Sequence, residues 1–150
     1  FGSSEMYYCG NEDDSLQETI EKVNESWGGD FQITYLNSWK SFINKCKKED
    51  HFVILCTMYG QNIPDMEDEL REILQHRDMV VIIGSEKIPP ALITLSDVNI
   101  AISNQPHSEV AALAILLDRL FQGKQLESKF TDPKINIIPQ KNGKKLVYKL

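Results

Sequence analysis

The sequence predicts an α/β fold, a mostly parallel sheet flanked by helices, on the strength of three observations. Short β-rich runs alternate with amphipathic helical patterns along the chain, as in βαβ units. Three of these runs, HFVILCT, MVVIIG and VNIAIS, are largely apolar, which is typical of strands covered on both faces. The length of 150 residues, with 41% hydrophobic and 25% charged residues, suits one soluble domain. We therefore expect a single domain over residues 1–150.

In the first part of the chain, two strand patterns are each followed by a helical pattern. A strand is expected at residues 6–9, and the next segment, SLQETIEKVNESWGG, has apolar residues at helical spacing. Ser15 and Glu18 lie three residues apart, as in a capping box, and Gly28 is expected to stop this helix. A second strand is expected at residues 31–35, before a helical pattern in NSWKSFINKCKKED.

The same alternation continues in the rest of the chain. Strands are expected at residues 51–57 and 79–84, separated by the helix IPDMEDELREIL. A strand at residues 98–103 precedes a long apolar helix that begins at Val110, and a last strand is expected at residues 134–139.

Charge and cysteine content narrow the classes of function. The formal net charge of −6 argues against a protein that coats nucleic acid indiscriminately. No apolar run approaches the roughly 18 residues that span a bilayer, so no membrane partner is expected. The three cysteines form no CxxC or Cys/His pattern, so structural zinc is not expected. Their odd number and the apolar surroundings of Cys46 and Cys56 favour reduced thiols in the cytoplasm.

The segment after Thr131 is locally basic, with Asp132 as its one acidic residue. It is either a solvated tail or a patch that contacts phosphates. Its lysines are Lys134, Lys141, Lys144, Lys145 and Lys149.

Three unusual loops follow the three apolar strands: TMYGQNIP, GSEKIPP and SNQPHSE. Ligands of open parallel sheets bind outside the carboxyl ends of the strands, and glycine or small polar residues let the backbone approach a small molecule. The sequence contains no GxGxxG or GxxxxGK[ST] motif, so a dinucleotide site or a P-loop is not supported. From the loops alone, a ligand site and ordinary turns are equally compatible.

His107 is a candidate general base, because histidine titrates near neutrality. No serine or aspartate at a recognisable spacing marks it as one, so the favoured interpretation is that His107 and Ser108 cap the following helix. Glu86 and Glu109 are candidate acidic residues of a site at the same edge. The alternative is that Glu86 is an ordinary surface charge and that Glu109 is a carboxylate that stabilises the start of the helix.

The helix that begins at Val110, VAALAILLDRLF, is apolar on nearly every face. Such a helix is buried in a large body or pressed against another subunit. A domain of this size has little interior in which to bury it, so we expect a two-fold homodimer contact on one side. Full burial within the monomer is the alternative.

Four segments, LCTMYG, VVIIGSEKIPP, ISNQPHSEVAALAILLDRL and KINIIPQKNGKK, together resemble the archaeal tRNA cytidine-56 2′-O-methyltransferases, a branch of the SPOUT superfamily. The resemblance runs in order from about Phe1 to Lys145. NQPHSEVAALA with GSEKIP about twenty residues upstream is a specific signature, whereas each segment alone is weak. The resemblance implies a dimeric α/β fold with a deep C-terminal trefoil knot, which sequence patterns do not indicate because chains rarely knot. It also implies S-adenosyl-L-methionine-dependent methylation of a ribose hydroxyl in the T loop of tRNA.

By this resemblance, the segment from Ile102 to Glu109 is the knot loop that wraps the adenosine of the cofactor, and the segment from Gly84 to Ile88 is its partner. Cys56 matches a cofactor-contacting position at which family members carry leucine, another apolar residue. The implied cofactor-binding residues are Cys56, Gly84, Ser85, Glu86, Lys87, Ile88, Ile102, Ser103, Asn104, Gln105, Pro106, His107, Ser108 and Glu109.

The catalytic base is not identified by the resemblance. The expected reaction, in-line attack of a ribose 2′-hydroxyl on a sulfonium methyl group, needs no covalent enzyme intermediate and no metal. In related SPOUT enzymes an arginine of the first, N-terminal strand-and-loop motif activates the hydroxyl, and here that strand and helix would precede Phe1. Asn104 and His107 are therefore candidates for positioning only.

Two other functions are compatible with the same residues. One is a SPOUT methyltransferase that acts on another RNA, and the other is a dimeric ligand-binding or RNA-binding module without catalysis. In each case that involves tRNA or another RNA, Lys141, Lys144 and Lys145 are expected to contact phosphates.

Overall fold

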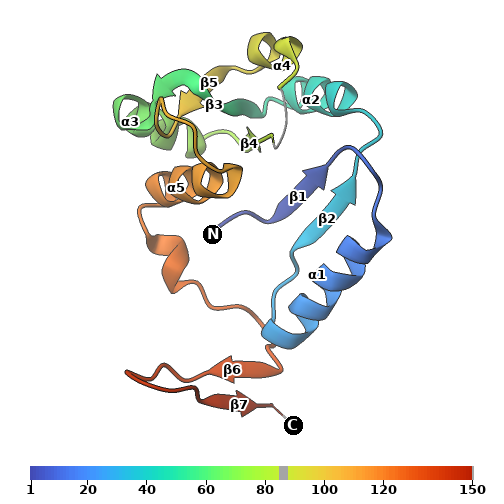
Figure 1. The fold of residues 1–150 in the computed structure, drawn as a ribbon, viewed down its shortest axis with the longest axis vertical. Coiled ribbons are helices and arrows are strands. Elements are labelled where there is room, and N and C mark those ends of the chain that lie inside the picture. The colour runs from blue at the N-terminus through green and yellow to red at the C-terminus, as the bar shows by residue number, and fades with distance from the viewer. Residues whose placement is uncertain (85–87, 150) are drawn as a thin grey trace. The chain divides into compact units, whose positions relative to one another are not determined.

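The computed structural model describes residues 1–84 and 88–149 (Figure 1). The chain divides into two compact units. The first unit comprises Phe1–Gly2 and Trp39–Glu127, and the second comprises Ser3–Ser38 together with residues 128–149. That residues 1–150 act as one domain stays a prediction.

The centre of the first unit is a three-stranded parallel sheet with the order β4-β3-β5. Its strands are β3 (Phe52–Asn62), β4 (Met79–Ile82) and β5 (Val98–Ala101). The side chains of Val53, Ile54 and Leu55 in the central strand are fully buried. The α/β class and its parallel sheet, predicted from the apolar runs, are therefore confirmed, whereas the trefoil knot stays a prediction.

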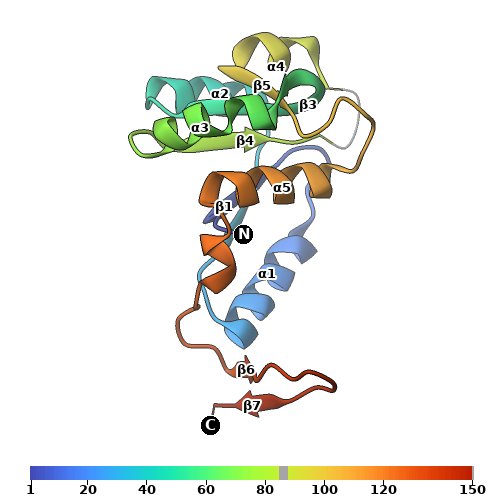
Figure 2. The ribbon, with the colours of Figure 1, turned by 90° about the vertical axis from the view of Figure 1, so that its left-hand side faces the viewer.

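Helices cover both faces of this sheet (Figure 2). On one face lie α3 (Ile63–Leu74) and α5 (Glu109–Phe121), and on the other lie α2 (Trp39–Lys48) and α4 (Pro90–Leu95). A short 3₁₀ helix, Lys124–Glu127, follows α5. Successive residues of β3 supply the two cores alternately, because side chains along a strand point to opposite faces.

The two cores share β3 but have different helices. Ile54 and Cys56 pack with residues of α3 and α5, whereas Val53 and Leu55 pack with residues of α2 and α4. Burial of each such aliphatic side chain stabilises the fold by roughly 1.5–3 kcal/mol. The first half of β3 is thus packed from both sides.

The second unit combines one helix with two pairs of strands. β1 (Glu5–Tyr8) lies parallel to β2 (Gln32–Tyr35), and α1 (Asp14–Trp27) connects them. β6 (Ile135–Ile137) and β7 (Leu146–Tyr148) form an antiparallel hairpin. Among the described residues of this unit, none is buried.

The structure corrects the expected start of α1. The helix begins at Asp14, and its N-cap is Asp13, whose carboxylate accepts a hydrogen bond from the Ser15 amide at 2.9 Å. The capping box proposed for Ser15 and Glu18 is therefore wrong, because the earlier aspartate already occupies the capping position. Gly28 ends the helix as expected, with a φ of 82° and its amide bonded to the Asn24 carbonyl.

Candidate functional site

The predicted site residues follow strands that are neighbours in the sheet. Since β4, β3 and β5 run parallel, their carboxyl ends meet at one edge of the sheet. Gly84 comes two residues after β4, and the segment from Ile102 to Ser108 connects β5 to α5. Three residues implied by the resemblance, Ser85, Glu86 and Lys87, lie outside the described residues.

Cys56 is a core residue of β3 and has an exposed fraction of 8%. Its side chain packs with Ile100 of β5 and with residues of α3 and α5, and Ile102 packs against the same cluster. Burial raises the pKa of the Cys56 thiol to about 12. The side chain is therefore a protonated apolar group rather than a nucleophile.

Ile88 lies on the opposite side of the sheet from Cys56. It packs against the cluster that includes Val53, Leu55 and Leu92, between the sheet and the pair α2 and α4. Ile102, in the loop after β5, and Ile88, in the segment after β4, therefore pack on opposite faces of the sheet.

Asn104 joins the loop after β5 to the segment TMYGQN, which was predicted to be a loop but forms the end of β3. Its Nδ2 atom donates a hydrogen bond to the carbonyl oxygen of Met58 at 2.8 Å and lies 3.5 Å from that of Gly60. The loop after β5 is therefore tied to the part of β3 that follows Cys56. The sequence predicted a positioning role for Asn104 but not this partner segment.

The partner segment is an irregular part of β3. Cys56 and Gln61 both pair with Ile100 of β5, so the register shifts between them. A Cβ at Gly60 would collide with the backbone of Asn99, which means that only glycine allows this approach. The segment TMYGQN carried a signal for this feature, a glycine within a strand, but the bulge itself was missed.

Ser108 and His107 have different roles at the start of α5. The Ser108 hydroxyl accepts a hydrogen bond from the Ala111 amide at 3.2 Å, so Ser108 is the N-cap that was expected. His107 is exposed and its Nδ1 lies 3.1 Å from the Ser108 carbonyl oxygen, so it does not share in the cap. Glu109 occupies the first turn, where a carboxylate is favoured by the helix dipole.

The loop between β5 and α5 presents unused backbone donors. The amides of Asn104, Gln105 and His107 donate no hydrogen bond to any other residue in the described part of the chain. Gln105 and Pro106 are exposed, whereas Ile102 is half-buried at the base of the loop. Backbone donors beside an apolar base suit the polar edge and flat face of a purine, so these residues fit an adenosine-containing cofactor.

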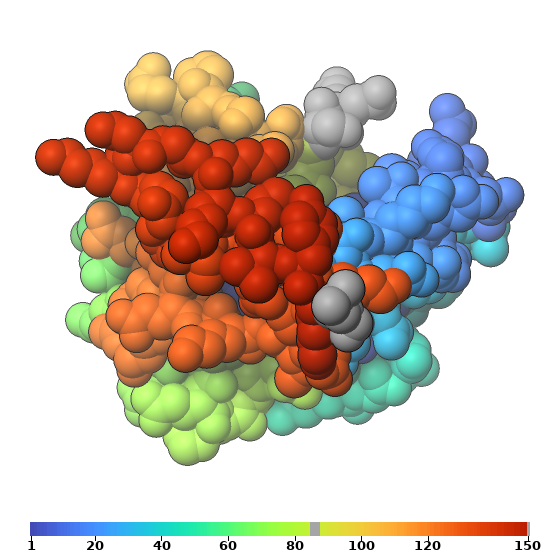
Figure 3. Space-filling model, turned by 90° about the horizontal axis from the view of Figure 1, so that it is seen from below, coloured from blue at the N-terminus to red at the C-terminus, as the bar shows by residue number. Residues whose placement is uncertain are grey.

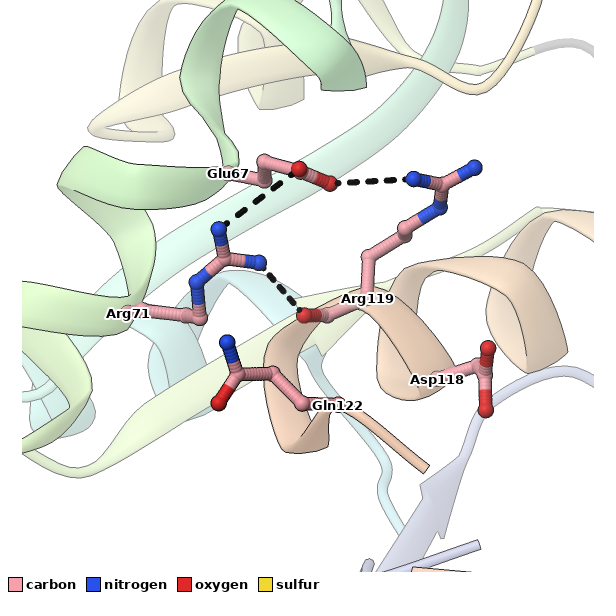
Figure 4. Close-up of a pocket in the computed structure, with 5 residues that line it drawn as sticks. All are labelled: Glu67, Arg71, Asp118, Arg119 and Gln122. Atoms are coloured by element: carbon pink, nitrogen blue, oxygen red, sulfur yellow. Dashed lines mark hydrogen bonds and ion pairs between the residues drawn. The ribbon is translucent and has the colours of Figure 1, made fainter. Parts of the chain in front are cut away.

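A separate polar hollow of about 280 Å³ lies between α3 and α5 (Figure 4). Glu67 stands between Arg71 and Arg119, at 3.5 Å from each guanidinium, and Arg71 also donates to the Arg119 carbonyl oxygen at 2.9 Å. Asp118 and Gln122 complete its lining. Because acidic and basic groups pair within it, this cluster joins the two helices rather than offering an anion site.

The predicted RNA-contacting lysines lie between β6 and β7, in the hairpin that Figure 3 shows at the surface in the dark red of the C-terminal end. Lys134 pairs with Glu25 at 3.3 Å and Lys149 pairs with Asp132 at 3.2 Å. The remaining three are exposed and form no ion pair with another described residue: Lys141, Lys144 and Lys145.

The described ranges 1–84 and 88–149 contain neither a membrane-spanning helix nor a metal-binding cluster. No helix there is long and apolar enough to cross a bilayer. Nor do three or more His, Cys, Asp or Glu side chains gather there as a metal ion would require.

Curated relatives share most of this chain. A protein of Methanocaldococcus jannaschii is 47% identical over 136 residues, covering 91% of this chain and 75% of the relative. Proteins of Pyrococcus abyssi and Thermococcus kodakarensis are 46% and 39% identical and cover 98% of the chain, with 74% and 82% of their own lengths matched. Each is named tRNA (cytidine(56)-2′-O)-methyltransferase.

A family model described as tRNA ribose 2′-O-methyltransferase, aTrm56, matches residues 27–147. That range includes β3, β4 and β5, the loops after them and the hairpin lysines. Together with the archaeal relatives, this match confirms the resemblance found in the sequence. The chain belongs to the aTrm56 family of tRNA ribose 2′-O-methyltransferases.

Proposed function

We propose that this protein transfers a methyl group from S-adenosyl-L-methionine to the ribose 2′-hydroxyl of cytidine 56 in the T loop of tRNA. The observation that carries the proposal is the family match over residues 27–147, which includes all the loops at the carboxyl edge of the sheet. The relatives supply the nucleotide, since their shared name specifies cytidine 56.

The cofactor binds at this carboxyl edge. The loop from Ile102 to Glu109 supplies backbone donors for the adenine and ribose, with Ile102 beneath them. The segment from Gly84 to Ile88 also contacts the cofactor, and Cys56 contributes through its backbone, because its thiol is buried in the core. Asn104 supports this arrangement by holding the loop after β5 against the segment that follows Cys56.

S-adenosyl-L-methionine, held by the loop from Ile102 to Glu109, would supply an activated methyl group for the ribose 2′-hydroxyl. The residues of this chain contribute chiefly by orientation, which accounts for a large part of the acceleration of such a transfer. His107 and Asn104 are positioning residues in this proposal. No residue of the chain is assigned as the base.

Substrate binding and assembly complete the proposal. Lys141, Lys144 and Lys145 contact tRNA phosphates, supported by their exposure and their lack of ion pairs with other described residues. One side of α5 forms a homodimer contact, and the chain has the SPOUT-type trefoil knot, both supported by the family resemblance. The protein works in the cytoplasm, where its tRNA substrate is found.

A methyl-transfer assay tests the proposal. Labelled S-adenosyl-L-methionine is incubated with the protein and an unmodified tRNA transcript, and with a matched transcript that carries 2′-deoxycytidine at position 56. We expect label in the first transcript alone, at one position that resists alkaline cleavage. Label in both transcripts indicates another RNA position, and label in neither, despite binding of S-adenosyl-homocysteine in calorimetry, indicates a binding module without catalysis.

A further inference from the structure

Tyr59 places an aromatic ring in solvent at the edge of the sheet where the site lies. Its exposed fraction is 84%, although it belongs to β3, whose residues Val53, Ile54 and Leu55 are fully buried. Tyr59 comes three residues after Cys56, within the stretch where the register of β3 against β5 shifts. The bulge thus turns one aromatic side chain of a core strand outward.

The backbone on both sides of Tyr59 is fixed. The carbonyl groups of its two neighbours, Met58 and Gly60, both face the side-chain amide of Asn104, at 2.8 and 3.5 Å. Gly60 also lies against the backbone of Asn99 so closely that no side chain fits. A ring held on a fixed backbone loses little conformational entropy when it binds a flat partner.

We propose that Tyr59 is a stacking platform for an unpaired base of the tRNA substrate, next to the nucleotide that is methylated. The inference rests on the proposed function, because it takes the substrate to be a tRNA loop. Proteins recognise single-stranded RNA largely by stacking exposed bases on aromatic side chains. Asn104 links the two roles, since the same side chain holds the cofactor loop and the backbone that presents Tyr59.

A stacking contact is also useful in an acidic protein that binds RNA. The chain has a formal net charge of −6, so general electrostatic attraction to RNA is weak away from the hairpin lysines. A stacked base adds affinity that does not depend on phosphate charge, and it is sequence-tolerant because every base has a flat face. The platform therefore positions the loop without requiring a basic surface around it.

The experiment compares Tyr59→Ala and Tyr59→Phe in the full chain with a control, Leu126→Ala, which truncates another exposed apolar side chain (66% exposed). Affinity for unmodified tRNA and for S-adenosyl-homocysteine is measured separately, with thermal unfolding as a check on the fold. We expect Tyr59→Ala to weaken tRNA binding roughly 5- to 150-fold, the range for loss of one stacked base. Tyr59→Phe and the control should bind tRNA like the wild type, and S-adenosyl-homocysteine affinity should not change in any of them.

Three results overturn the inference: unchanged tRNA affinity in Tyr59→Ala, an equal loss in Tyr59→Phe, or a parallel loss of S-adenosyl-homocysteine affinity. The last would mean that the ring contacts the methyl donor instead of RNA. Failure of the proposed function is distinguishable, because it appears as a wild-type protein that binds tRNA without methylating it. In that case the affinities of the variants still decide the role of Tyr59, and a wild type that binds no tRNA overturns both.

Discussion

At the scale of single residues, Asp97 shows how the sheet is secured at the end opposite the site. Its carboxylate accepts hydrogen bonds from Lys47 Nζ at 2.7 Å and from the Val53 amide at 2.8 Å. Partial burial raises the pKa of this carboxyl, but the hydrogen bonds from Lys47 and Val53 and the nearby positive charges outweigh it, and the net pKa lies below the ordinary 3.8. The ionised form of Asp97 therefore stabilises the fold.

We expect Asp97→Asn to lower the free energy of unfolding at neutral pH by about 1 kcal/mol, a modest value because the side chain is partly open to solvent. Since the pKa is lower in the folded state, this contribution is fully present above the unfolded pKa of about 3.9. It is lost as the pH falls through the lower folded pKa. Urea titrations of both proteins between about pH 7 and pH 2.5 measure the difference.

Glu69→Gln, which changes an exposed carboxylate on α3, is the control and should leave the free energy of unfolding nearly unchanged. A difference between the wild type and Asp97→Asn that stays constant with pH would contradict the role assigned to the carboxylate.

At the scale of elements, the irregular end of β3 determines the shape of the site. The strand runs regularly beside β4 from Phe52 to Leu55. Beyond Cys56 the register shifts, and the backbone of Gly60 comes close to that of Asn99 in β5. This approach places the carbonyl groups of Met58 and Gly60 where Asn104 reaches them, so the bulge holds the site together.

Replacing Gly60 by alanine should disrupt this arrangement. The new methyl group would meet backbone atoms of Asn99 that cannot move away, so we expect a loss of about 1–3 kcal/mol in the free energy of unfolding. Binding of S-adenosyl-homocysteine should weaken as well. Gly123→Ala is the matched control, because its φ of 76° gives backbone strain but no atom lies within 4 Å of the added methyl. Equal losses in the two variants would argue against the steric role of Gly60.

Helix α5 has one packed side and one open side. Ala112, Leu116, Leu117 and Leu120 are buried, whereas Ile115 has an exposed fraction of 42%. This pattern excludes full burial of the helix within the described structure and suits the homodimer that we propose. The open side would then be covered by the same helix of a second copy.

We therefore expect the wild type to sediment as a dimer at micromolar concentration and Ile115→Glu to sediment as a monomer, because an unpaired carboxylate cannot be buried in such a contact. Leu126→Glu, an exposed site outside α5, should remain dimeric. A monomeric wild type under these conditions would contradict the dimer.

At the scale of the whole molecule, an acidic chain must bind an acidic substrate. The formal net charge is −6. The hairpin differs locally, because its exposed lysines Lys141, Lys144 and Lys145 form no ion pair with another described residue. Two further lysines of the same segment, Lys134 and Lys149, have carboxylate partners. The charge distribution thus favours specific contact at the hairpin over adhesion to RNA in general.

Replacing Lys141, Lys144 and Lys145 by alanine should weaken tRNA binding and reduce the slope of log affinity against log salt by roughly 2 to 3, about 0.7–0.9 for each phosphate contact. Affinities measured between about 50 and 200 mM salt give the slope. The control with the same charge change elsewhere replaces Lys22, Lys45 and Lys48. A similar effect in the control would show that total charge matters, and an unchanged slope in the first variant would reject the lysine contacts.

Hydrophobic patterns specified most elements of this chain but not all of them. The apolar runs predicted β3, β4 and β5, because a strand covered on both faces leaves a continuous signal. α4 (Pro90–Leu95) was missed, since its paired prolines suggested a loop rather than the first turn of a helix. β7 (Leu146–Tyr148) was missed because three residues among lysines carry too weak a pattern.

The sequence alone indicated the family and the loops that carry its site. Both can be recognised from short segments of the chain, because a motif and the strand before it are continuous in sequence. The hydrogen bond between Asn104 and Met58 joins residues 46 positions apart, and it exists because β3 and β5 are neighbours with a shifted register. The outward turn of Tyr59 has the same origin. Contacts of this kind depend on how strands pair in space, and no periodicity in a single sequence encodes that pairing.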